Sequence, residues 1–299
     1  MRTRKRVDGL LLLDKPSGIT SNFALQQVKR LYDAQKVGHT GTLDPLASGL
    51  LPLCFGEATK FSACLLEADK VYEATLKFGV TTETGDSEGR IVSVRPVRIS
   101  VEQFGDVLQG FLGQIEQIPP MFSAIKIQGR PLYDYARQGK TVERPKRSVN
   151  IREIRLIEWE QDNTALIQVH CSKGTYIRSL AEDIGEKLGC GAHLCALRRI
   201  ASSGFHIGAS VNLERLACMD EVERRASLMP VDVLVAAWPK LDLDANETHL
   251  ISQGRVIRRD GLASGAIRLY GAVGEFLGMG EILEGIVQPR RLIAQSVMT

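Results

Sequence analysis

Hydrophobic and polar residues alternate without interruption from Tyr72 to Phe78. Successive side chains of an extended strand point to opposite faces, so one face of this segment is apolar and the other is polar. The pattern predicts a half-buried strand, and residues 9–14, 149–159 and 164–171 are typical of further strands. A chain with these segments must build a sheet that buries at least one face.

Segments with helical spacing of apolar residues separate the predicted strands. We expect one helix to follow a capping residue at Thr20 or Ser21. A second helix, which starts with a capping box, should run from Ser100 to Gly113, and a third from Tyr176 to Leu188. The strands neither alternate strictly with these helices nor form one block. We therefore predict an α/β (α+β) fold with a mixed, largely antiparallel central sheet flanked by helices and loops.

The length of the chain, 299 residues, suggests two domains. A boundary near Trp238 separates a larger domain, residues 1–238, from residues 239–299, which are Gly-rich and predicted to be mainly β-structure. The smaller module is near the lower size limit for a domain that folds alone.

The composition excludes several classes of protein. Hydrophobic residues make up 44% and charged residues 24%, as in ordinary globular proteins. No uncharged apolar run approaches the roughly 20 residues of a spanning helix, and the basic N-terminus lacks the apolar core of a signal peptide. We expect a cytoplasmic protein with reduced cysteines. The spacing of Cys190, His193 and Cys195 matches no common zinc motif, so no metal site is expected.

Basic residues concentrate in one part of the chain, although the net charge is only +3. Residues 121–147 contain seven Lys and Arg against two acidic residues. A short strand at 123–127 and a helix at 132–139 are predicted within this segment. Such a cluster is typical of a phosphate-binding surface, and a solvated charged loop is the alternative.

A single acidic residue, Asp44, stands in the small-residue stretch GHTGTLDPLASGLL at 38–51. The glycines and the proline indicate a sharp bend, and a carboxylate held there needs a specific role. This stretch, together with DKPSGITS at 14–21, KVYEATLKFGVTTETGD at 70–86 and CSKGTYIRSLAEDIGEKLGCGAHLCALRR at 171–199, resembles the TruB family of bacterial tRNA pseudouridine-55 synthases. The C-terminal segment resembles, more weakly, the small PUA-type RNA-binding module of that family.

The resemblance implies the pseudouridine synthase fold and a defined reaction at uridine 55 in the T-loop of tRNA. The N-glycosidic bond is broken, the base is rotated, and the base is rejoined to the ribose through C5. Asp44 corresponds to the family's nucleophile, because a carboxylate can bond transiently to carbon and leave again. The sequence leaves open whether it attacks the base or the sugar, or drives elimination at the ribose. No metal or organic cofactor is implied.

The resemblance assigns four further residues to the site. Arg178 corresponds to the arginine paired with the nucleophile, where a guanidinium opposes the rise in pKa that burial causes in a carboxylate. Tyr72 corresponds to a tyrosine that stacks on the uracil and whose hydroxyl can help to remove the C5 proton. Tyr176 is expected to contact the nucleotide. Leu197 is expected to wall the base, although a core leucine is nearly as good an interpretation.

The remaining assignments concern the RNA. His39 corresponds to a histidine that fills the space left when the uridine is pulled out of its stack. Lys15 and Lys60 are expected to contact phosphates or to support their motifs. The segment 121–147 corresponds to a mobile loop that closes over the T-arm of tRNA, which is the expected partner. The resemblance implies a monomer with no obligatory protein partner.

Three other functions stay open at this point. A non-catalytic tRNA-binding chaperone would use the same basic surface but would not need Asp44. An enzyme that uses Asp44 as a phosphoryl acceptor would require a P-loop or an acidic magnesium cluster, and the sequence has no clear example of either. A guide-RNA-dependent relative is the nearest alternative, but the compact chain with its own basic segment favours an enzyme that acts alone.

Overall fold

The computed structural model describes residues 4–123, 125–160 and 162–294. Its main sheet has ten strands. They are β1 (Gly9–Lys15), β2 (Val37–His39), β3 (Ser48–Phe55), β4 (Lys70–Phe78), β7 (Gly113–Gln117), β10 (Arg147–Glu160), β11 (Thr164–Cys171), β12 (Ala192–Ser202), β13 (Phe205–His206) and β14 (Val211–Asn212).

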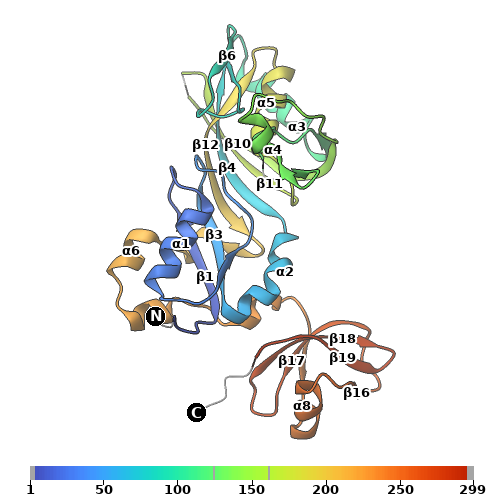
Figure 1. The fold of residues 1–299 in the computed structure, drawn as a ribbon. Helices are drawn as coiled ribbons and strands as arrows, with labels where there is room; N and C mark the ends of the chain where they lie inside the picture. Colours follow the sequence, from blue (N-terminus) through green and yellow to red (C-terminus); the bar gives the residue numbers. More distant parts are fainter. Residues whose placement is uncertain (1–3, 124, 161, 295–299) are drawn as a thin grey trace.

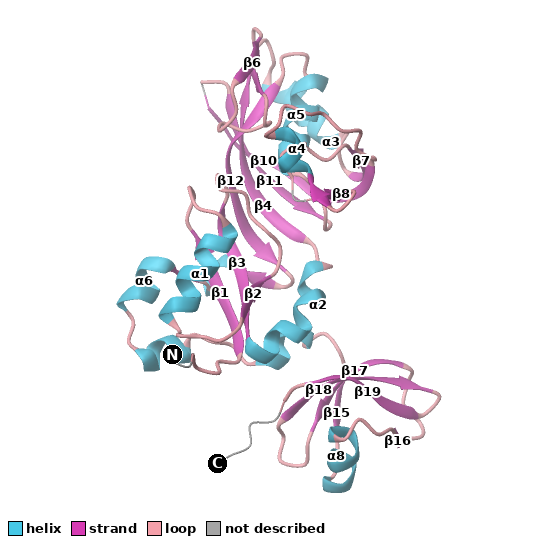
Figure 2. Ribbon diagram, in the orientation of Figure 1, coloured by secondary structure: helices cyan, strands magenta, loops and turns pink. Residues whose placement is uncertain are grey.

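The strand order is β14-β1-β3-β12-β4-β11-β10-β7, with β2 paired to β3 and β13 paired to β12 (Figures 1 and 2). Within the described residues, the pairs β1/β14 and β3/β12 are parallel and the other pairs are antiparallel. The prediction of a mixed, largely antiparallel sheet flanked by helices is therefore confirmed.

Helices lie beside the strands, and four of the eight α-helices in the described residues were predicted from the sequence. The eight are α1 (Ser21–Leu31), α2 (Ser62–Leu66), α3 (Val101–Gln109), α4 (Leu132–Ala136), α5 (Ile177–Lys187), α6 (Leu213–Cys218), α7 (Glu221–Ala226) and α8 (Ala245–Ser252). The side chain of Thr20 accepts a hydrogen bond from the amide of Phe23, so Thr20 is the N-cap of α1. The predicted helices at the start of the chain and before Leu188 are both present.

The end of the second predicted helix differs from the prediction. Helix α3 ends at Gln109 with Gly110 as its C-cap, whereas Gly113, with a φ of +84°, begins β7. Phe111 lies in the turn that follows the helix and is buried there. An apolar residue at this position therefore does not require the helix to continue to Gly113.

The elements of the basic segment are shorter than predicted. The strand expected at 123–127 is reduced to β8 (Lys126–Ile127), which pairs with β9 (Arg130–Pro131). Ala124, within the expected strand, lies outside the described residues. Helix α4 ends at Ala136 rather than at residue 139.

Two hydrophobic cores meet at the centre of the sheet. Ala74, Leu76 and Phe78, on the apolar face of β4, pack into a core with α3 and α5. A second core lies between α1 and strands β1 and β3. Tyr72 and Leu197 pack against both cores, so the neighbouring strands β4 and β12 join the two halves of the sheet.

The C-terminal residues form a second sheet with its own core (Figure 1). Its strands are β15 (Lys240–Asp242), β16 (Ile257–Arg258), β17 (Gly265–Tyr270), β18 (Phe276–Leu283) and β19 (Ile286–Leu292). Their order is β15-β17-β18-β19-β16, and α8 packs beside β16 and β19.

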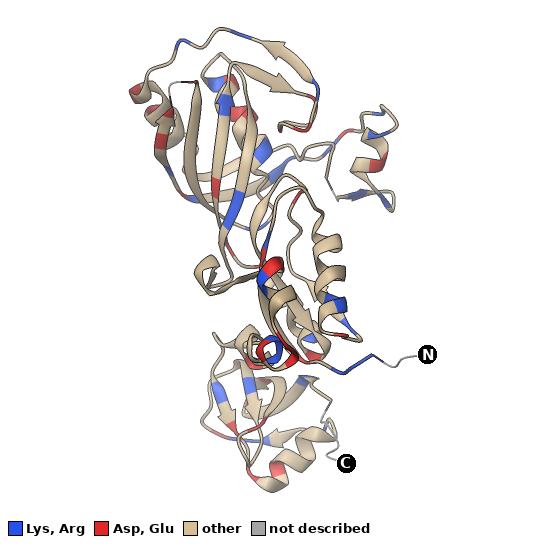
Figure 3. Ribbon diagram, turned by 90° about the vertical axis from the view of Figure 1, so that its left-hand side faces the viewer, with Lys and Arg blue, Asp and Glu red and all other residues tan. Residues whose placement is uncertain are grey.

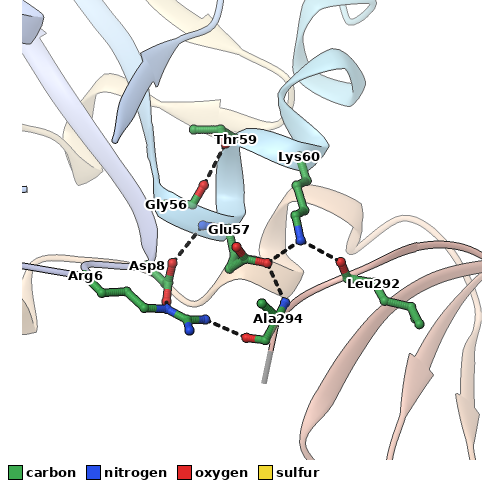
Figure 4. Close-up of polar contacts among 8 residues, drawn as sticks. All are labelled: Arg6, Asp8, Gly56, Glu57, Thr59, Lys60, Leu292 and Ala294. Atoms are coloured by element: carbon green, nitrogen blue, oxygen red, sulfur yellow. Dashed lines mark hydrogen bonds and ion pairs between the residues drawn. The ribbon is translucent and has the colours of Figure 1, made fainter. Parts of the chain in front are cut away.

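A polar network ties the end of this second sheet to the larger part of the protein (Figure 4). The Lys60 Nζ donates to the Glu57 carboxylate at 2.6 Å and to the Leu292 carbonyl at 2.9 Å. The Ala294 amide donates to the same carboxylate at 2.6 Å, and Arg6 donates to the Ala294 carbonyl. Charged groups from two distant parts of the chain thus fix the strand that ends at Leu292.

Candidate active site

Asp44 lies in the loop between β2 and β3, and hydrogen bonds hold this loop against α1. The Ser21 hydroxyl donates to the Leu43 carbonyl at 2.9 Å and accepts from the Leu43 amide at 2.8 Å. The Ala47 amide donates to the Asp44 carbonyl at 3.1 Å, which closes a turn. The carboxylate is therefore placed at a bend fixed to the start of a helix.

Arg178, in the first turn of α5, pairs with this carboxylate. Its Nη2 lies 2.9 Å from an Asp44 carboxylate oxygen, and the arginine side chain is 5% exposed whereas that of Asp44 is 43% exposed. Burial raises the pKa of Asp44, while the Arg178 charge and hydrogen bond lower it. The arginine thus favours the ionised form that the surroundings of the carboxylate disfavour.

A second carboxylate, Asp86, contacts the same guanidinium. Its oxygen lies 3.7 Å from Arg178 Nη1, and its side chain is 5% exposed. It also accepts from the Thr84 hydroxyl and from the Glu88 amide at 3.1 Å. The sequence analysis gave Asp86 no role, because residues 82–90 (TETGDSEGR) have the composition of an ordinary loop. The signal was a lone Asp between glycines, at the end of one of the family motifs.

Asp44 and Arg178 line two adjoining cavities. The larger, of about 540 Å³, is also lined by His39, Asp86 and Tyr133. The smaller, of about 100 Å³, is also lined by the three predicted pocket residues Tyr72, Tyr176 and Leu197. The structure therefore brings together Asp44, Arg178, Tyr72, Tyr176, Leu197 and His39, although they come from five separate segments of the chain.

Tyr176, at the N-terminus of α5, is held by the buried side chain of Gln117 from the edge strand β7. The Gln117 Oε1 accepts from the Tyr176 amide at 3.0 Å, and the Gln117 Nε2 donates to the Tyr176 carbonyl at 3.3 Å. Burial raises the pKa of Tyr176, which keeps its hydroxyl protonated at neutral pH. The ring can therefore act as a neutral wall of the smaller cavity.

His39, at the end of β2, lies in the wall of the larger cavity. Its buried Nδ1 has no hydrogen-bond partner among the described residues. Burial lowers the pKa of His39, and the charge of Arg199 lowers it further, so the ring is neutral at pH 7. A neutral planar ring at a cavity wall is suited to stack against a nucleotide.

The structure does not place Lys15 and Lys60 where they can contact a phosphate in this site. Lys15 is fully buried, and its Nζ donates to the carbonyls of Pro16 at 2.8 Å and Ile19 at 2.7 Å. Burial lowers the pKa of Lys15 to about 8. Lys60 belongs to the network that ties the end of the second sheet to the larger part of the protein. Lys15 supports its own motif, as one of the two expectations for it stated, and Lys60 does not line either cavity.

The basic segment reaches the larger cavity through Ser123, Tyr133 and Arg137. Figure 3 shows Lys and Arg along this part of the chain, which stands out from the body of the protein. The Phe122 carbonyl, at the start of the segment, accepts a hydrogen bond from Arg178 Nη2 at 2.7 Å. The segment and Asp44 therefore contact the same guanidinium. Arg178 thus connects the loop of Asp44 to the start of the basic segment.

The Cys–His group noted in the sequence forms no metal centre in the described part of the chain. Cys195 Sγ lies 3.6 Å from His193 Nε2, while His193 Nδ1 bonds to the Val80 carbonyl at 2.9 Å. No set of three or more His, Cys, Asp or Glu side chains among residues 4–123, 125–160 and 162–294 is arranged to hold a metal ion. Within these residues, no helix has the length and apolarity required to cross a bilayer.

Three family models match consecutive parts of the chain. "TruB family pseudouridylate synthase (N terminal domain)" matches residues 29–177, and "tRNA pseudouridylate synthase B C-terminal domain" matches 178–236. "Pseudouridine synthase II TruB, C-terminal" matches 239–293. Together they span the second sheet and every strand of the main sheet except β1.

Whole-length relatives agree with these models. A tRNA pseudouridine synthase B of Azoarcus sp. (strain BH72) is 53% identical over 97% of this chain and 96% of its own length. One of Dechloromonas aromatica (strain RCB) is 53% identical over 98% of this chain and 97% of its own length. Among solved structures, a chain in the crystal structure of a Cbf5–Nop10–Gar1 complex matches with a TM-score of 0.70 at 25% identity, covering 94% of this chain and 83% of that one.

Proposed function

The chain belongs to the TruB family of pseudouridine synthases, and from this premise we propose that it converts uridine 55 in the T-loop of tRNA to pseudouridine. The observation that carries the proposal is the pair formed by Asp44 and Arg178 at the junction of two cavities. A protein that only bound RNA would not need a carboxylate held there against the effect of burial on its pKa.

In the proposed reaction Asp44 is the nucleophile. It acts on the everted uridine while the N-glycosidic bond breaks and the base turns within the smaller cavity. Splitting the exchange of bonds into steps of attack and release lowers the barrier of each. Arg178 favours the anionic carboxylate that attacks and that is released again, because a guanidinium stays protonated at any physiological pH.

The remaining pocket residues hold the base and the RNA. Tyr72 and Leu197 enclose the uracil, and the Tyr72 hydroxyl takes part in removing the C5 proton. Tyr176 contacts the nucleotide. His39 occupies the space that the everted uridine leaves, which offsets part of the few kcal/mol that unstacking costs.

The two parts of the chain divide the work of binding. We assign residues 1–238 to the catalytic domain and residues 239–299 to a PUA-like domain that binds RNA. Phosphate contacts from residues 121–147 add affinity without reading sequence. The enzyme acts in the cytoplasm as a monomer on the T-arm of tRNA, without a cofactor or an obligatory protein partner.

One assay tests this function. Purified protein is incubated with unmodified tRNA in buffer containing EDTA and no cofactor, and pseudouridine is mapped by position. We expect it at position 55. Failure to modify the T-loop would contradict the substrate assignment. If the Asp44→Asn variant kept normal turnover, the assignment of the nucleophile would be wrong. A wild type that binds tRNA but forms no pseudouridine would favour the chaperone.

A further inference from the structure

Arg199 lies at the point where the two halves of the sheet meet. It pairs with Tyr72 across β12 and β4, and with Gly49 across β12 and β3. Its side chain is among the largest fully buried ones in the protein, with 1% exposure. A charged side chain of this size is rarely buried unless its charge or its hydrogen bonds have a specific use.

The guanidinium holds both ends of the loop that carries Asp44. Its Nε donates to the Leu50 carbonyl at 2.7 Å, and its Nη2 donates to the Gly41 carbonyl at 3.0 Å. Gly41 has a φ of +78°, and a Cβ at this position would lie 3.2 Å from Arg199 Nη1. The close approach of the guanidinium and the left-handed backbone both favour glycine here.

The charge of Arg199 has no acidic partner within ion-pair distance in the described residues. The neighbouring Arg198, by contrast, pairs with Asp14 at 2.7 Å. A buried guanidinium without a counter-charge is costly, and a group nearby that becomes negative during a reaction would relieve this cost.

The groups around Arg199 identify Tyr72 as the one that it favours in an anionic form. The other titratable neighbours on which its charge acts are the basic groups Lys15 on β1, His39 on β2 and Lys70 on β4, and it lowers the pKa of each. Cross-strand pairing places Tyr72 beside Arg199; burial raises the pKa of Tyr72, and the charge of Arg199 opposes that rise.

Two acids also face Tyr72, and both disfavour its ionisation. Cys171, on β11, and Asp44, on its loop, each raise the pKa of Tyr72. Burial raises the pKa of Cys171 itself to about 12, so its thiol stays neutral across the working range. Arg199 is thus the group next to Tyr72 that favours a phenolate.

We propose that Arg199 is a positioning residue of the reaction, which fixes the Asp44 loop at both ends and presents its charge to the Tyr72 hydroxyl. The inference rests on the proposed function. After C5 has bonded to the ribose, the phenolate oxygen of Tyr72 takes the C5 proton, and the electron pair of the C5–H bond returns to the uracil ring. The positive charge stabilises the phenolate that this step requires.

The test measures loss of the C5 proton, as tritium released from tRNA labelled at C5 of uridine, in single turnovers. Arg199→Met and Arg199→Gln remove the charge, and the glutamine keeps a hydrogen-bond donor in case the methionine variant fails to fold. Arg199→Lys keeps the charge but loses the guanidinium fork. Arg198→Met is the matched control, because it removes an adjacent arginine that pairs with Asp14.

We expect the neutral variants to release tritium about 100-fold more slowly, the size of a general-base contribution, and Arg199→Lys to lose less. Their pH–rate profiles should shift to higher pH relative to Arg199→Lys, and a deuterium isotope effect at C5 should appear. The control should behave like the wild type. Combined with Tyr72→Phe, the neutral substitutions should cost little more than Tyr72→Phe alone, whereas an effect exerted through Lys15 or His39 would persist in that background.

The losses caused by the Arg199 and Tyr72 substitutions could instead add in the double variants, with the pH profile and the isotope effect unchanged. That result would show that Arg199 only maintains the fold and would overturn the inference. An equal loss in Arg198→Met would do the same. Absence of pseudouridine from the wild-type reaction is a different result, because it contradicts the proposed function itself.

Discussion

Arg178 Nη2 and the Asp44 carboxylate lie 2.9 Å apart, yet the arginine side chain is 5% exposed and the aspartate 43%. The cation is fixed within the protein and the anion faces the cavity. An arrangement of this kind keeps the carboxylate available to a ligand without letting it turn away.

Replacement of Asp44 by Asn should remove activity without weakening the fold. The raised pKa of Asp44 means that the folded protein binds this proton more tightly than the unfolded chain, so ionisation of Asp44 lowers stability as the pH rises from 3.8 through the folded-state pKa. A neutral amide avoids that loss. We expect Asp44→Asn to form no pseudouridine, to bind tRNA within a few fold of the wild type, and to melt no lower at pH 7. A clearly lower melting temperature would contradict this account of the site.

Loss of the second carboxylate should disturb Arg178. Asp86→Asn removes the charge 3.7 Å from Arg178 Nη1, which frees the guanidinium to shift relative to Asp44. We expect turnover to fall about 100-fold, as for small misplacements of reacting groups. Asp86→Ala should also destabilise the protein by about 2 kcal/mol, because it removes the carboxylate that accepts hydrogen bonds from the Thr84 hydroxyl and the Glu88 amide. Glu83→Gln, at an exposed position of the same loop, is the control and should alter neither quantity.

Lys60 and Arg137 should differ in how they affect tRNA binding. Arg137 is exposed at the larger cavity, whereas Lys60 bonds to Glu57 and Leu292 away from it. The slope of log Kd against log salt counts the phosphates that a protein neutralises. Arg137→Gln should reduce this slope by about 1, and Lys60→Gln should leave it unchanged. An equal reduction in both variants would restore Lys60 as a phosphate ligand.

Lys15 should make stability depend on pH in the alkaline range. Its pKa falls from 10.5 to about 8 on folding, so between these values the unfolded chain binds a proton that the folded protein has released. The contribution of Lys15 to the free energy of unfolding therefore rises with pH from about 8 to 10.5. Denaturant titrations at several pH values should show this rise as a difference between the wild type and Lys15→Met. A difference that does not vary with pH would exclude it.

Local patterns in the sequence predicted what local interactions decide. The alternation around Tyr72 gave the correct strand and the correct buried face, and one of the two candidate caps, Thr20, is the N-cap of α1. The end of α3 was misplaced because Phe111 is buried from a turn as well as it would be from a helix. The contacts of Asp86 and Arg199 could not be predicted, because each is made with a partner from a distant segment, Arg178 for one and Gly41 for the other. The contact of Lys60, expected to bind phosphates or to support its motif, is likewise made with a distant segment, the end of the second sheet at Leu292.

The joint between β3 and β12 has a mechanical consequence. It consists of two residue pairs, Arg198 with Ser48 and Arg199 with Gly49, whereas β12 is paired with β4 over most of its length. Asp44 is carried on one side of this narrow joint and Tyr72 on the other. Any hinge-like movement at this joint would change the distance between the two groups, so an RNA bound across the pocket would hold them at a fixed distance. Amide hydrogen exchange around Gly49 should then be slower with tRNA bound than in the free protein.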